Sequence, residues 1–452
     1  MKNRKRFLFA FAAALVFFFG LLAVFGVGIN NDSEQYITMH IHRDPGYPFF
    51  LWLIRLVNEE HALIITGVVQ AVIAAFCTAE FTDYIAESFQ LKTLSTVIIF
   101  ILVLMPHIIT PLFSVTTIVL SAGIMSEALC LPLFLLFIKE LHKGCTTNSK
   151  SAACFSLLLS VVLSLIRAQM MAAILIWLFV FVVKVILERQ YKRILILLVA
   201  VGLSFGGRSV LIKTYNYAFQ GYFINTTYGA VNILTNILYA SDKEQGEQIE
   251  DVELQEIFYL LYDMMDEEKY NYKYGGDTAF EKAAYLESVH DGLKFDVCEA
   301  GLKQYLLDKG VDDYIIQNIE ADKYATSLTR EILPGCFSEW LSNYLLLGFR
   351  GAIRNVAIVH PILSIYALIM GGAAIVMMFL FFRKDKESKE AWLMLIALLT
   401  VAGISFSTAL TIMCLSRYMV YGFTGFYSAV YLMFLVWVRY WNKDKRGISN
   451  GI

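Results

Sequence analysis

The sequence predicts an all-α polytopic membrane protein of about ten transmembrane helices, with an extracytoplasmic segment that is mainly α-helical. Of its 452 residues, 58% are hydrophobic and only 17% are charged, a composition outside the range of ordinary soluble domains. The mean hydropathy is +0.60, and many apolar segments exceed the roughly 18 residues that span a bilayer. The lipid bilayer is therefore the expected surroundings of most of the chain.

The apolar segments define the expected spans in order. The first, residues 7–28, follows the basic stretch Lys2 to Arg6. It is long for a signal peptide and no clear small-residue cleavage site follows it, so we expect an uncleaved helix. Pro106 and Pro111 interrupt the pattern around the third and fourth spans. Nine further spans are expected near residues 61–85, 93–110, 121–138, 153–166, 169–187, 194–212, 355–382, 391–413 and 418–438.

The distribution of Lys and Arg orients these spans. With the N-terminus inside, the loops of highest Lys and Arg density fall on one side, as the positive-inside rule requires. We therefore expect a multi-pass protein of the cytoplasmic (inner) membrane whose first outer loop, residues 30–60, faces outside. The expected division is an N-terminal transmembrane module (1–213), an acidic extracytoplasmic segment (214–353) and C-terminal transmembrane helices (354–452).

The outer segment is strongly acidic, with 23 Asp and Glu against 9 Lys and Arg over residues 242–331. Nucleic acid is not an expected partner, because duplex binding needs a basic face. Helical patterns predict that this segment is folded, and Cys298 and Cys336 within it can pair or remain free. Residues 49–57 are too short to span and are expected to form an interfacial helix. Residues 337–354, on the side where the chain re-enters the membrane, are expected to do the same.

A polar stretch just past the first span holds the candidate catalytic residues Asp32 and Glu34. Ionisable groups at a membrane face are functional candidates. The alternatives are that Asp32 merely flanks the first helix and that Glu34 is a solvated loop residue. His40 and His42 together with these carboxylates are an alternative site for a divalent metal, although histidines two residues apart are not a helical ligand pair.

Arginines on the expected outer face oppose the positive-inside bias. Arg167 and Arg417 each stand in a very short turn between two apolar helices. A guanidinium there can clamp a phosphate in bidentate geometry, or it can simply extend to water. Glu127 is expected to begin a helix at its outer end, where its charge either stabilises the helix N-terminus or contributes to a site.

Six short motifs, in this order, resemble those of the polytopic bacterial glycosyltransferases of the GT-C superfamily, the group related to protein O-mannosyltransferases and aminoarabinose lipid A transferases. The motifs are DSEQY (32–36), RDPGYPFFL (43–51), VVQAV (68–72), SEAL (126–129), LIR (165–167) and SRY (416–418). The resemblance covers residues 7–185 and 337–440, and residues 214–330 match nothing in it. Ala168 and Gln169 stand where relatives often have proline after the arginine, and Asp32 and Glu34 replace an adjacent acidic pair.

The resemblance implies a GT-C-like fold and a polyprenyl-phosphate-linked sugar as the donor, with a hydroxyl of a glycan, lipid or protein as the acceptor. It implies that Asp32 is the general base of an inverting transfer, with Glu34 as a second catalytic candidate. The positions carried over as substrate-binding are Arg43, Tyr47, Glu127, Arg167, Arg417 and Tyr418. No cofactor is expected, because a sugar phosphate already has a good leaving group.

Three other functions fit a chain of this kind. A flippase or exporter of lipid-linked saccharides would show charged residues in mid-span and symmetry between its halves, and neither is clear in the sequence. A polymerase or ligase acting on lipid-linked oligosaccharides would use a diphosphate-linked donor. A non-catalytic scaffold would retain the fold without depending on Asp32.

Overall fold

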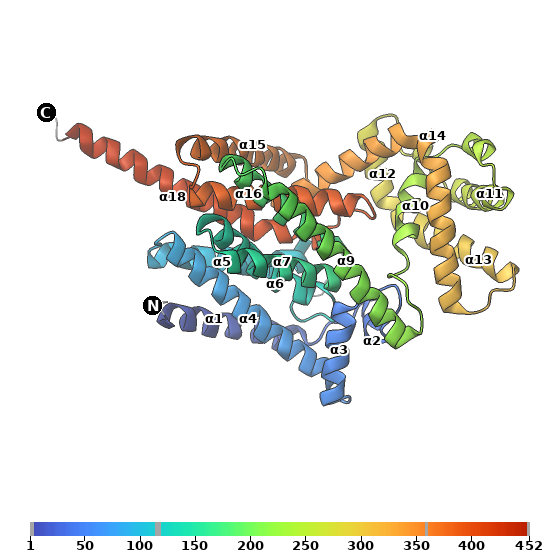
Figure 1. The fold of residues 1–452 in the computed structure, drawn as a ribbon, viewed down its shortest axis with the longest axis horizontal. Coiled ribbons are helices and arrows are strands. Elements are labelled where there is room, and N and C mark those ends of the chain that lie inside the picture. The colour runs from blue at the N-terminus through green and yellow to red at the C-terminus, as the bar shows by residue number, and fades with distance from the viewer. Residues whose placement is uncertain (1–3, 114–118, 358–359, 450–452) are drawn as a thin grey trace.

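The computed structural model describes residues 4–113, 119–357 and 360–449. Within these ranges every regular element is a helix, and the one extended contact is an isolated parallel bridge between Gly28 and Gly123. Figure 1 shows the long helices of the two ends of the sequence side by side, with a smaller group of helices, α10 to α14, at one end of them. The prediction that the protein is all-helical is thus confirmed.

Eight helices of the described residues are long and apolar enough to cross a membrane. They are α1 (Arg4–Phe25), α4 (Ala62–Ser88), α5 (Thr93–Phe113), α8 (Met171–Leu187), α9 (Arg193–Gln220), α15 (Pro361–Lys384), α16 (Lys389–Ala409) and α18 (Tyr421–Ser449). Two expected spans correspond to α6 (Glu127–Thr146), which carries several charges, and to α7 (Lys150–Ile166), which has 17 residues. The expected number of about ten therefore stays a prediction.

Local sequence accounts for several helix ends. Ser149 accepts a hydrogen bond from the backbone of Ala152 and caps α7. Gly221 ends α9 with a φ of +81°, a left-handed conformation that glycine adopts without strain. Helix α5 continues through Pro106 and Pro111 to Phe113, so these prolines do not end it where the sequence pattern suggested a break.

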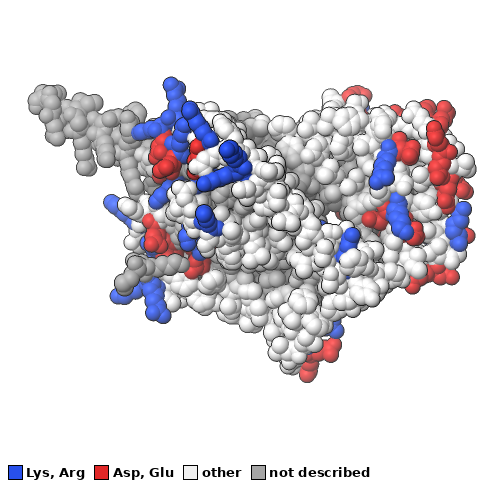
Figure 2. Space-filling view, in the orientation of Figure 1, with Lys and Arg blue, Asp and Glu red and all other residues white. Residues whose placement is uncertain are grey.

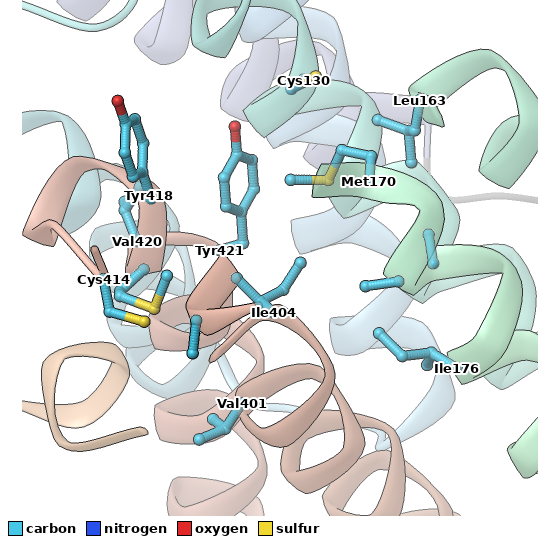
Figure 3. Packing of buried hydrophobic residues seen from close by; sticks show 14 of the residues in the cluster. Cys130, Leu163, Met170, Ile176, Val401, Ile404, Cys414, Tyr418, Val420 and Tyr421 are labelled. Carbon is cyan, nitrogen blue, oxygen red and sulfur yellow. The ribbon is translucent and has the colours of Figure 1, made fainter. Parts of the chain in front are cut away.

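The bundle interior is apolar and tightly packed beneath the polar end that holds Asp32. Figure 3 shows Cys130 of α6, Leu163 of α7, Ile176 of α8 and Tyr421 of α18 around one interior, each at most 2% exposed. Such an interior fixes the relative positions of helices that are far apart in sequence.

Between α9 and α15 the described residues are helical, as expected, and none of their helices is a candidate membrane span by length and composition; we call this part of the chain the extramembrane segment. It comprises α10 (Gly229–Tyr239), α11 (Val252–Glu267), α12 (Ala279–Gly292), the π-helix η4 (Leu293–Glu299), α13 (Ala300–Asp308) and the 43-residue helix α14 (Tyr314–Val356). The expected interfacial helix 337–354 is the last part of α14, whereas 49–57 lies in the separate helix α3 (Gly46–Val57). Cys298 and Cys336 are buried free thiols.

Charge is segregated along the long axis of the molecule. In Figure 2, Lys and Arg gather toward the end where α1 begins, and Asp and Glu dominate the opposite end, over the extramembrane segment. Close to the end where α1 begins, Arg6 pairs with Asp83 and Lys139 pairs with Glu80, both at 2.5 Å. Asp32 lies at the other end of the bundle, where the extramembrane segment joins it.

Candidate functional site

The loop that follows α1 is fastened to the bundle before it reaches Asp32. The Gly28 amide donates to Ala122 O at 3.0 Å, and the Ile124 amide donates to Gly28 O at 2.8 Å. Ser33 is fully buried, and its hydroxyl donates to Ile124 O at 2.8 Å. These bonds fix the start of the short helix α2 (Ser33–Ile37) against the segment that leads into α6.

Asp32 lies between two guanidinium groups that come from opposite ends of the sequence. Its Oδ1 accepts from Arg43 Nη2 at 2.7 Å, and its Oδ2 accepts from Arg417 Nη2 at 3.2 Å. The Asp32 side chain is 32% exposed. Burial raises the pKa of Asp32, but the charges of Arg43 and Arg417 outweigh burial and hold this pKa below its usual value. Asp32 is therefore an ionised carboxylate that ligands can reach.

A second, more deeply buried ion pair lies beside the first. Glu127 is the first residue of α6, and its Oε1 lies 2.9 Å from Arg167 Nη1, with only 3% of the Glu127 side chain exposed. Arg417 Nε is 4.0 Å from the same oxygen. The sequence prediction that Glu127 begins a helix is confirmed, and its carboxylate also binds the two arginines.

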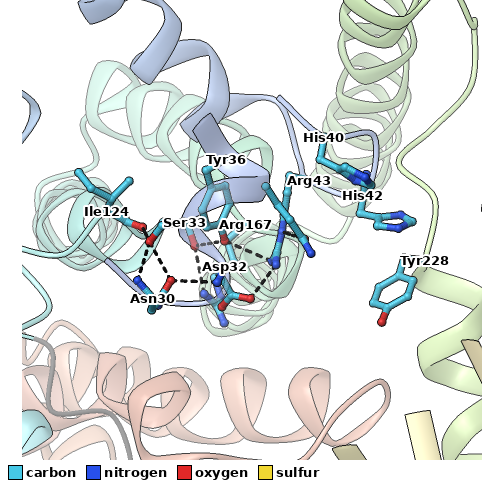
Figure 4. Close-up of polar contacts among 12 residues, drawn as sticks. Asn30, Asp32, Ser33, Tyr36, His40, His42, Arg43, Ile124, Arg167 and Tyr228 are labelled. Carbon is cyan, nitrogen blue, oxygen red and sulfur yellow. Dashed lines mark hydrogen bonds and ion pairs between the residues drawn. The ribbon is translucent and has the colours of Figure 1, made fainter. Parts of the chain in front are cut away.

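Aromatic side chains complete the cluster. Tyr36 donates to Ser126 Oγ at 3.1 Å, and Arg43 covers the Tyr36 ring at 4.8 Å. Tyr418 accepts from Arg417 at 2.6 Å, and its ring is 4.5 Å from the guanidinium carbon of Arg167. Figure 4 shows Arg43, Arg167 and Tyr36 gathered around Asp32.

Two glutamines that the sequence analysis did not single out hold the guanidinium groups in place. Gln35 accepts from Arg43 Nε at 2.8 Å, and Gln169 accepts from Arg167 Nε at 2.9 Å. Gln169 also donates to Thr408 Oγ1 at 2.6 Å and so ties this turn to α16. Gln169 was noted only as a departure from a family pattern, and no spacing in the sequence indicated its partners.

Positive charge is in excess in this cluster. Three guanidinium groups, those of Arg43, Arg167 and Arg417, face the two carboxylates of Asp32 and Glu127. Among the described residues, neither the buried Arg417 Nε nor the Glu127 Oε1 4.0 Å from it makes a hydrogen bond, although buried polar groups normally have a partner. This arrangement is suited to an anionic ligand that approaches Asp32.

The structure brings together most of the predicted site residues: Asp32, Arg43, Glu127, Arg167, Arg417 and Tyr418. Tyr47 is fully buried in α3 and donates to Gln70 at 2.7 Å, so it lies behind Tyr36, whose ring centroid is 5.0 Å away. Glu34 is exposed, and in the described ranges its carboxylate enters no ion pair. Their predicted roles in binding and catalysis stay predictions.

The histidines lie to one side of the carboxylates. The rings of His40 and His42 are 4.4 Å apart, and His42 stacks at 4.6 Å on Tyr228, which Figure 4 shows beyond Arg43. Burial lowers the pKa of His42 to about 2, so its ring is neutral. Across the described part of the chain, no three His, Cys, Asp or Glu side chains form a group that could hold a metal ion.

Gly46 permits the loop that carries Asp32 and Arg43 to approach the turn that carries Arg167. A Cβ at position 46 would lie 2.8 Å from both Ile166 N and Leu165 O, which are backbone atoms. The loop and the end of α7 therefore meet through their main chains, and this contact positions Arg43 relative to Arg167.

Comparisons with protein-family models, with curated proteins and with solved structures found no match to this chain. The class defined by fold and site is a helical membrane protein with an arginine–carboxylate cluster at one end of its bundle. The resemblance to GT-C enzymes rests on the motifs alone.

Proposed function

We propose that this protein is a membrane glycosyltransferase of GT-C type. It moves a sugar from a polyprenyl-phosphate-linked donor to a hydroxyl acceptor on the extracytoplasmic side of the cytoplasmic membrane. The observation that carries the proposal is the reachable carboxylate of Asp32 between Arg43 and Arg417. A general base beside spare guanidinium donors provides the two groups that an inverting transfer from a lipid phosphate needs.

The bonds, electrons and protons of the transfer are accounted for without a cofactor. The acceptor oxygen forms a bond to the anomeric carbon while the bond from that carbon to the phosphate oxygen breaks. The electron pair of the broken bond leaves with the lipid phosphate, and Asp32 takes the acceptor proton. The arginines bind the departing phosphate, where exclusion of water strengthens their attraction.

Donor binding and base strength are coupled in this arrangement. The phosphate competes with Asp32 for Arg417, which contacts the carboxylate at the longer of the two distances, 3.2 Å. Loss of that contact removes a charge that lowers the pKa of Asp32, so the carboxylate becomes a stronger base when the donor is bound. Glu34, two residues away and exposed, is the second candidate base.

Replacement of Asp32 tests the proposal. The protein is reconstituted in vesicles with a panel of polyprenyl-phosphate monosaccharides and an envelope extract as the source of acceptors, and release of polyprenyl phosphate is followed. Asp32→Asn is expected to reduce release at least 100-fold, the usual scale of a lost general base. Asp312→Asn, at an exposed position before α14, is the matched control. Release by Asp32→Asn within tenfold of wild type would remove Asp32 from the role of base.

A further inference from the structure

Lys294 of the extramembrane segment contacts a ring that packs on the loop leading to Arg43. It belongs to the π-helix η4 (Leu293–Glu299), between α12 and α13. Single π-helical turns are rare and frequently occur at functional sites, because they shift a side chain relative to an α-helix. The sequence analysis found no motif in this segment, and Lys294 was not among its candidates.

A column of rings connects Lys294 to the loop that carries Arg43. The Lys294 ammonium lies 4.5 Å from the centre of the Tyr228 ring. The ring of His42, the residue that precedes Arg43, packs on the same Tyr228 ring, with the two ring centres 4.6 Å apart. Tyr228 itself has a φ of +83°, a strained conformation for a residue with a side chain. Figure 4 shows His42 and Tyr228 on the side of Arg43 that faces away from Asn30.

Lys294 brings a positive charge that Asp291, Glu299 and Asp32 offset only through space. In the described ranges it enters no ion pair, and its ring contacts are Tyr228 and Phe295. Glu299 is already paired with Lys303 at 2.5 Å, and the Asp291 side chain is 65% exposed beside His290.

The same charges act on the pKa of Lys294. Burial is the largest cause that lowers this pKa, and the charge of Arg43 adds to it, whereas Asp291, Glu299 and Asp32 oppose the shift; together these effects bring the pKa of Lys294 to about 8. His42 faces Lys294 as a neutral ring. Lys294 is thus mostly protonated at pH 7, within the electrostatic reach of the Asp32 cluster.

This charge matters because the transfer changes the charge of the phosphate. A polyprenyl-phosphate sugar is a phosphodiester with one negative charge, and the lipid phosphate leaves with two, because it keeps the electron pair of the broken bond. The arginines and carboxylates of the cluster leave one positive charge uncompensated, and Lys294 provides another. Groups that bind the departing charge more strongly than the donor accelerate the reaction.

We propose that Lys294 binds the lipid phosphate as it leaves, so that the extramembrane segment adds a cation to the Asp32 cluster and the total charge matches the phosphate dianion rather than the monoanionic donor. This inference rests on the proposed glycosyl transfer. It assigns to the unmatched segment a direct part in catalysis, through a residue that discriminates between the two charge states of one ligand.

Binding of two lipids tests the inference without the need for turnover. The probes are a polyprenyl monophosphate and its methyl phosphodiester of equal chain length, measured in nanodiscs at about pH 7.2, where a phosphomonoester is mostly a dianion. Lys294→Gln is expected to weaken monophosphate binding about tenfold and diester binding less than about twofold. Lys294→Arg should retain the preference, and Lys323→Gln, an exposed lysine of α14, is the matched control.

The outcomes separate the two proposals. Binding of both lipids by wild type, with equal losses or no loss in Lys294→Gln, would overturn the role of Lys294 and leave the transferase proposal standing. Binding of neither lipid by wild type would overturn both. Where turnover is measurable, kcat/KM of wild type should fall above about pH 8, as Lys294 loses its proton, and Lys294→Arg should abolish that fall.

Discussion

The buried pair of Glu127 and Arg167 should dominate the stability of the site. Glu127→Gln removes the carboxylate 2.9 Å from Arg167 Nη1, and the two side chains are only 3% and 14% exposed. Loss of one partner of a buried ion pair usually costs about 3–5 kcal/mol, because the other charge stays buried without compensation. Arg167 retains Ser126, Gln169 and the face of Tyr418, so we expect a loss of about 2–3 kcal/mol.

The measurement is unfolding in mixed detergent micelles with increasing dodecyl sulfate, followed by tryptophan fluorescence. Glu59→Gln is the matched control, because Glu59 is 78% exposed in its pair with Arg55. That change should alter the free energy of unfolding by less than about 0.5 kcal/mol. A Glu127→Gln variant that unfolds with the same free energy as the control would refute the argument from burial. Glu127→Leu combined with Arg167→Met should recover part of the stability, because no charge is left unpaired.

Two further predictions concern the loop that carries Asp32. Gly46→Ala should lower transfer at least about tenfold, since its Cβ would meet backbone atoms at 2.8 Å and overpacking displaces its neighbours. Gly20→Ala is the control, because a Cβ there meets nothing within 4 Å, and it should transfer like wild type. Equal activity of the two variants would contradict the prediction. The pKa of Asp32 is lowered in the folded protein, so the stability from its ion pairs is present above pH 3.8 and is lost as pH falls through the folded pKa. The free energies of unfolding of wild type and Asp32→Asn should therefore differ at pH 7 and become equal in acid. A difference that does not change with pH would refute the assignment of these ion pairs to Asp32.

The sequence predicted the helical membrane class and most of the cluster, because both depend on signals that are local in the chain. Apolar runs define the spans, and short motifs mark Asp32, Arg43, Glu127, Arg167 and Arg417. The sequence indicated that these residues meet only through their expected position on the same, outer face of the membrane. The number of spans was harder to predict, since α6 carries charges that pair inside the bundle and α7 is short.

Contacts that connect distant segments could not be predicted from the sequence. Gln169 acts through Thr408, which is 239 positions away, and Tyr47 is buried against Gln70 although its motif suggested a ligand contact. Lys294 acquires its position from a π-helical turn and from the stack on Tyr228. Neither spacing nor composition encodes such contacts, because they follow from how segments that are distant in the sequence pack against one another.

The identity of the lipid bound to the protein tests the central claim most directly. Native mass spectrometry of the gently purified protein, with Asp32→Asn alongside it, would detect a lipid retained at the arginine cluster. We expect a polyprenyl-phosphate monosaccharide on both proteins, and its mass would name the sugar. A polyprenyl-diphosphate oligosaccharide in its place would contradict the account, because a flippase or polymerase binds that lipid and Asp32 would lose its assigned role.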